Sequence, residues 1–174
     1  MENPETITIA ISRADGGMTV KRIILPEFGE VTPEAIEAEL AKRPHMFANH
    51  LGWEIVPDDY VDANTDRTFR AAWRHNPGGP KPDHDMGKAR DIQRDNLRRA
   101  RANPLEALDT AYLLADEQGD QARKLDVAAQ KQKLRDVTTD SRIEAAATVE
   151  ELKALTLDVL TGDRMETQRE RETR

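Results

Sequence analysis

The chain has 174 residues, a formal net charge of −7, 34% charged and 4% aromatic residues, and no cysteine. These values exclude disulfides and thiolate chemistry, and they argue against a chain-wide nucleic-acid or anionic-membrane surface. So few aromatic residues favour a small domain with a helical appendage over one large core. No signal-peptide pattern opens the chain and no apolar run approaches the roughly 20 residues that span a bilayer, so we expect a cytoplasmic protein.

The first 60 residues predict a small sheet. Residues 7–12 alternate three isoleucines with small or polar residues, which is typical of a half-buried strand. The Asp-Gly-Gly at 15–17 provides glycines for a tight hairpin turn, and residues 19–25 predict the return strand. Residues 53–56 predict a third short strand.

A covering helix is predicted between the second and third strands. Thr32 is a good N-cap residue and Pro33 suits the first helical position. Val31 and Ile36 have the spacing of a hydrophobic staple. We expect the helix to bury Ile36 and Leu40 and to end before the next proline.

Residues 66–83 predict the joint between two parts of the chain. Phe69 and Trp73 lie four residues apart, which places them on one face of a short helix. They are either a core plug between the two parts or an exposed stacking platform or partner hot spot. Residues 75–83 contain three prolines and two glycines, which we interpret as the main boundary. The predicted domains are a head over 1–80, a helical arm over 81–161 and a disordered charged tail over 162–174.

The arm predicts helices throughout. One helix follows a cap at Asp83 or Asp85, and Asn103-Pro104 marks either a new cap or a kink. Gly119-Asp120 separates two helices that form an antiparallel hairpin. The predicted seam residues are Leu105, Leu108, Tyr112 and Ala115 on the first helix and Ala122, Leu125 and Ala129 on the second. Finally, Thr148 and Glu151 form a capping box that opens a last amphipathic helix.

Two charged clusters have competing interpretations. The arginines of residues 81–101 form a self-neutralised helix face with Asp91 and Asp95, or they bind nucleic acid or an acidic protein. The Asp-His-Asp at 83–85 caps a helix or, together with His75, ligates a metal. In both cases we favour the first interpretation. No motif specifies catalysis, so we expect no enzyme, no metal and no cofactor.

Five segments carry a family resemblance: DRTFRAAWRHN, DMGKARDIQRDNLRRAR, LDTAYLLADEQGD, KQKLRDVT and AATVEELKAL. Together they cover about residues 66–157 and resemble small proteins encoded in bacteriophage and prophage tail regions, including tail-fibre-associated proteins and tail assembly chaperones. The resemblance implies a non-enzymatic viral protein. The predicted elements themselves indicate an α+β, mainly α, fold, in which a head formed by a β-hairpin and a helix is followed by the helical hairpin and a final helix.

The resemblance also implies a partner and a place of action. The expected partner is a tail-fibre or baseplate protein, or a second copy of the chain, met in the host cytoplasm during assembly or in the virion tail. The alternative is a phage-encoded inhibitor of a host defence protein; nucleic acid and membrane are the least expected partners. The candidate partner-binding residues are Phe69, Trp73, Tyr112, Leu152, Leu155 and Leu160.

Overall fold

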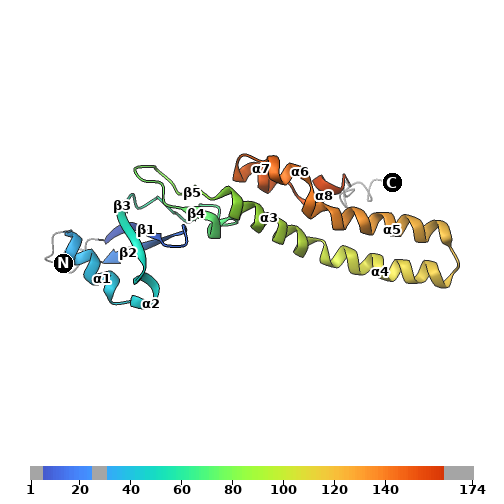
Figure 1. Ribbon diagram of the computed structural model, residues 1–174, viewed down its shortest axis with the longest axis horizontal. Coiled ribbons are helices and arrows are strands. Elements are labelled where there is room, and N and C mark those ends of the chain that lie inside the picture. Colours follow the sequence, from blue (N-terminus) through green and yellow to red (C-terminus); the bar gives the residue numbers. More distant parts are fainter. Residues whose placement is uncertain (1–5, 25–30, 163–174) are drawn as a thin grey trace. The chain divides into compact units, whose positions relative to one another are not determined.

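The computed structural model describes residues 6–24 and 31–162. The chain forms two compact units, Met1–Asp85 and Met86–Arg174, which are described separately (Figure 1). An antiparallel sheet in the first unit and helices in the second confirm the predicted α+β, mainly α, class. The predicted end of the second strand at Leu25 and the predicted disordered tail lie outside the described residues, apart from Gly162 at the start of that tail.

The first unit is built on a three-stranded antiparallel sheet of order β2-β1-β3. The strands are β1 (Thr6–Arg13), β2 (Met18–Ile24) and β3 (His50–Val56). The predicted hairpin is confirmed, with Gly16 at φ +74° in the turn. The predicted third strand is also confirmed, although it begins at residue 50 rather than 53.

Helices α1 (Pro33–Ala41) and α2 (Pro44–Phe47) contribute to the core over the isoleucine face of the sheet. The Thr32 hydroxyl accepts the Ala35 backbone N–H at 3.2 Å, which confirms the predicted cap. Ile36 and Leu40 are buried against the β1 isoleucines, as predicted, and Phe47 joins the same cluster.

The opposite face of the sheet is buried too, which corrects the prediction of a half-buried strand. Thr8 is 4% exposed and Ala10 is fully buried. Tyr60 and Trp73, from the chain that follows β3, pack with Ala10 in a second core cluster. Small side chains on this face of β1 leave room for the two aromatic rings.

The segment around Trp73 is not the short helix we predicted. A single turn of 3₁₀ helix covers Arg70–Ala72, and Trp73 instead begins the two-residue strand β4 (Trp73–Arg74). This strand pairs with β5 (Asp83–His84), so the predicted break at 75–83 is largely a hairpin loop. The Asp85 backbone N–H donates to the Ala72 carbonyl at 2.8 Å and closes the hairpin.

The second unit is helical. Its long helices are α3 (Met86–Ala100), α4 (Ala102–Glu117) and α5 (Gln121–Asp136), followed by a 3₁₀ turn at Val137–Thr139. Helices α4 and α5 form the predicted antiparallel hairpin (Figure 1). Asn103 is not a cap, because α4 begins at Ala102 and Arg101 keeps a helical backbone at φ −80° and ψ −9°.

The predicted last helix is split into short pieces. Helix α6 (Ser141–Ala145) precedes α7 (Val149–Ala154) and α8 (Leu157–Thr161). The capping box is confirmed, since the Thr148 hydroxyl accepts the Glu151 N–H at 3.2 Å. The split occurs because Leu155 leaves the helical region at ψ 68° and Thr156 caps a new helix.

Trp73→Ala tests the second core cluster. Removing a buried aromatic side chain leaves a cavity beneath the sheet, so we expect the free energy of unfolding to fall by about 3–5 kcal/mol. Both tryptophans, Trp53 and Trp73, lie in the first unit, so the remaining Trp53 fluorescence reports its unfolding in urea. Leu51→Ala is the control, because Leu51 is 74% exposed. Equal stabilities of the two variants would contradict this account of the core.

Candidate protein-binding surface of the helical unit

The helical unit is held together by side chains that donate to carbonyls at the C-terminal ends of helices. Arg101, between α3 and α4, donates to the Leu134 and Arg135 carbonyls at 3.1 and 2.6 Å. These carbonyls belong to the last turn of α5, where no backbone N–H within the helix can reach them. A guanidinium there also complements the negative end of the helix dipole.

Helix α3 caps two of the short helices in the same way. Arg90 donates to the Ala146 carbonyl, at the end of α6, at 3.0 Å. Gln93, which is 6% exposed, donates to the Leu155 carbonyl, at the end of α7, at 2.9 Å. A buried amide that is hydrogen-bonded in this way fixes the position of α7 on α3.

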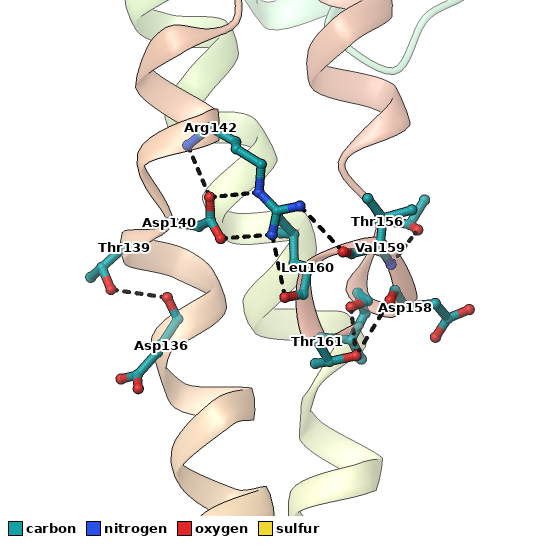
Figure 2. A network of polar contacts seen from close by, with 10 residues as sticks. Asp136, Thr139, Asp140, Arg142, Thr156, Asp158, Val159, Leu160 and Thr161 are labelled. Carbon is teal, nitrogen blue, oxygen red and sulfur yellow. Dashed lines mark hydrogen bonds and ion pairs between the residues drawn. The ribbon is translucent and has the colours of Figure 1, made fainter. Parts of the chain in front are cut away.

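Arg142 performs the same role for α8 (Figure 2). Its guanidinium contacts the Val159 and Leu160 carbonyls at 3.4 Å each. Two further hydrogen bonds, at 3.0 and 2.9 Å, join it to the Asp140 carboxylate. These bonds from Arg142 lower the pKa of Asp140. Asp140 also caps α6 by accepting the Arg142 backbone N–H at 2.9 Å.

Arg94 and Arg98 of α3 confirm the predicted pairing with Asp91 and Asp95, whereas Arg99 donates to the Asp95 carbonyl and the Asn96 amide oxygen. Arg94 pairs with Asp91 at 2.8 Å, and Arg98 pairs with Asp95 at 2.5 Å, both at the three-residue helical spacing. Arg94 also forms an ion pair with Glu144 of α6. Arginine from this stretch therefore serves two purposes, pairing along α3 and holding α6 against it.

The seam between α4 and α5 differs from the prediction on its α5 side. Ala122, Leu125 and Ala129 are exposed, and the inward positions are Lys124, Val127, Lys131 and Leu134. Lys124 and Lys131 place their ammonium groups 5.2 and 5.1 Å from the centroid of the Tyr112 ring. Their ammonium groups also pair with Asp116 and Asp109, respectively. Lysine ammonium groups thus lie over the Tyr112 ring where we expected alanine and leucine to pack.

This seam leaves three leucines exposed near the turn of the hairpin. Leu113 and Leu114 precede the turn with 62% and 43% of their surface exposed, and Leu125 follows it at 64%. Helices α6, α7 and α8 lie toward the opposite end of the hairpin (Figure 1). The leucines therefore form an apolar tip at the free end of the unit, which we call the hairpin tip.

The six predicted partner-binding residues have different environments. Phe69 and Trp73 are 3% and 6% exposed, and Leu152 is fully buried. Tyr112 lies between its two lysines, and Leu155 and Leu160 are half-buried. The structure does not gather these residues into one surface. The composition did not indicate the hairpin tip. The sequence did contain one indication, because Leu113 and Leu114 are not among the predicted seam residues of α4.

A hydroxyl, an imidazole and a carboxylate also align in the first unit. The Ser12 Oγ lies 3.1 Å from Nδ1 of His75, and the His75 Nε2 lies 2.9 Å from Glu54 Oε2. That order of groups resembles a nucleophile, base and acid. However, Nε2 makes no directed hydrogen bond despite the short distance, and Glu54 also accepts the Gly78 N–H at 3.3 Å. We interpret the three side chains as a tie between the sheet and the β4–β5 loop.

Within the described ranges, no three His, Asp or Glu side chains are grouped to hold a metal ion. Among those same residues, no helix combines the length and apolar character required to cross a membrane. No family model, curated protein or solved structure matches the chain.

Arg101→Met tests the cap on α5. The substitution keeps the aliphatic stem but removes both hydrogen bonds, so we expect a loss of about 1–3 kcal/mol in the free energy of unfolding. Urea unfolding followed by circular dichroism at the helical band measures it. Arg98→Met is the matched control and should change stability by less than about 0.5 kcal/mol, because its side chain is 54% exposed. A larger loss of stability for Arg98→Met than for Arg101→Met would contradict the interpretation that Arg101 caps α5.

Asp140→Asn tests the ion pair at α6. Asn keeps an N-cap acceptor but removes the charge and one of the two oxygens that accept from Arg142. Because the folded pKa of Asp140 is lowered from 3.8, its contribution to stability is complete above pH 3.8 and is lost as the pH falls through the folded value. We therefore expect the variant to be less stable at neutral pH and the difference to shrink in acid. Urea unfolding between pH 2.5 and 7 measures this; a difference constant over the range would refute it.

Proposed function

We propose that the protein binds another protein through the hairpin tip, as a non-enzymatic assembly factor or minor structural component of a bacteriophage tail. The observation that carries the protein-binding role is the exposure of Leu113, Leu114 and Leu125 on either side of the turn between α4 and α5. The tail role is supported by the resemblance of residues 66–157 to proteins of phage tail regions.

Contacts between α4 and α5 fix the hairpin before a partner binds, and this affects the binding free energy. Single exposed leucines are ordinary on protein surfaces, but here three exposed leucines lie within six residues of the same hairpin turn. The Lys124 and Lys131 contacts with Tyr112 hold the two helices together beneath these leucines. A preformed tip loses little conformational freedom when a partner covers it, so more of the apolar burial is retained as affinity.

Charge around the hairpin tip narrows the chemistry of the partner. Residues 106–126 contain six acidic and two basic residues. One of those basic residues, Lys124, is already paired with Asp116. An apolar groove with a basic rim would complement this surface and speed encounter. We propose that a tail-fibre or baseplate chain supplies that groove, in the manner of helix-in-groove recognition.

The test is capture of partners from phage-producing cells by the full-length protein, with mass spectrometry as the readout. The double variant Leu113→Glu/Leu125→Glu places charge in the apolar tip and should lose the captured tail chain. Leu51→Glu is the matched control, because Leu51 is an equally exposed leucine in the first unit. It should capture the tail chain as well as the natural sequence does.

Three outcomes would overturn the proposal. Capture of a host defence protein instead of a tail chain would replace the tail role with that of a phage-encoded inhibitor. Loss of capture with Leu51→Glu alone would move the contact to the sheet edge at β3. Undiminished capture by the double variant would remove the hairpin tip from the interface.

A further inference from the structure

A cavity of about 420 Å³ lies in the first unit. Its walls include Thr8 and Val20 of the sheet, Val61 from the chain after β3, and Trp73. Trp73 belongs to the core cluster that covers this face and Val61 packs against that cluster, so packed apolar side chains form part of the inner wall. The volume is within the range of cavities that hold small ligands.

Three arginines line the same cavity. Arg22 comes from β2, Arg67 from the loop before the 3₁₀ turn, and Arg70 from the turn itself. All three are exposed, and none forms a side-chain hydrogen bond or ion pair with the described residues. By contrast, Arg74, which follows the lining residue Trp73 in the sequence, is paired with Asp85 at 2.5 Å. Three guanidinium groups around one cavity, without a partner in the part of the chain that the structure describes, create a local positive potential within an acidic protein.

Two carboxylates also line the cavity, and each accepts hydrogen bonds from nearby residues. Asp58 accepts the Thr8 hydroxyl at 2.7 Å. Asp62 accepts the Thr65 hydroxyl at 2.8 Å and the Asn64 N–H at 2.9 Å. The lining therefore holds more arginines than carboxylates, and the carboxylates are committed to their own local bonds. The arginine donors remain available for an oxyanion, which the planar guanidinium binds in a bidentate manner.

We propose that this cavity binds a small ligand that carries an oxyanion, a carboxylate or a phosphate, on an apolar body. The arginines hold the oxyanion at the rim, and the apolar body lies against Val61 and Trp73. This site is independent of the hairpin tip, because all its residues belong to the first unit.

Titration of the full-length protein with phenyl phosphate, benzoate and inorganic phosphate at low salt tests the proposal. The readout is the Trp73 indole N–H resonance in a ¹H–¹⁵N spectrum, with Trp53 as internal reference and assignment by Trp53→Phe. We expect saturable shifts of the Trp73 resonance with phenyl phosphate, benzoate or both, and the tighter of the two identifies the oxyanion. Inorganic phosphate should bind about tenfold more weakly or worse, because it buries no apolar surface.

Variants assign the binding to the arginines. Arg67→Gln/Arg70→Gln should weaken binding at least about tenfold, and Arg22→Gln should weaken it separately. All three side chains are exposed, so the fold should survive, and the unchanged Trp53 resonance verifies this. Arg43→Gln is the matched control: Arg43 is an exposed arginine of the same unit that does not line the cavity. Absence of saturable shifts with both aromatic probes, or equal binding by the arginine variants, would overturn the proposal.

Discussion

The helical unit depends on hydrogen bonds from side chains to carbonyls at helix C-termini. Helices α6, α7 and α8 have five, six and five residues, far too short to be stable alone in water. Each receives a side-chain N-cap from its own sequence and a donor from elsewhere at its C-terminal end. Because Arg90 and Gln93 both lie on α3, that helix holds the C-terminal ends of α6 and α7.

This arrangement explains how a chain so poor in aromatic residues builds a helical unit with little apolar seam. Two lysines of α5 take the place of apolar seam residues: their ammonium groups lie over the Tyr112 ring and also pair with Asp116 and Asp109 on α4. Apolar residues that would otherwise fill the seam are then free to lie outside it. Leu125 is such a residue, predicted to be inside and found 64% exposed.

Local signals predicted much of this structure. The caps at Thr32 and Thr148 and the glycine turn at 16 depend on a few neighbouring residues, so sequence rules identified them. Long-range contacts were not predictable in this way. Nothing near Gln93 indicates that its amide meets a carbonyl 62 positions later. The α5 seam was predicted wrongly on Ala122, Leu125 and Ala129, whereas the inward residues Lys124, Val127, Lys131 and Leu134 repeat at three- and four-residue spacing and include two charged side chains.

The capping arginines of the helical unit and the arginines that line the cavity of the first unit differ in their partners. In the helical unit Arg90, Arg101 and Arg142 are occupied by carbonyls of their own chain, which leaves leucine side chains as its most distinctive free surface. In the first unit the sheet and its aromatic cover form the core, and the three cavity arginines make no side-chain hydrogen bond or ion pair with the described residues. Guanidinium groups placed in this way, beside apolar wall residues, favour a small anionic ligand, whereas exposed leucines on the hairpin tip favour a protein.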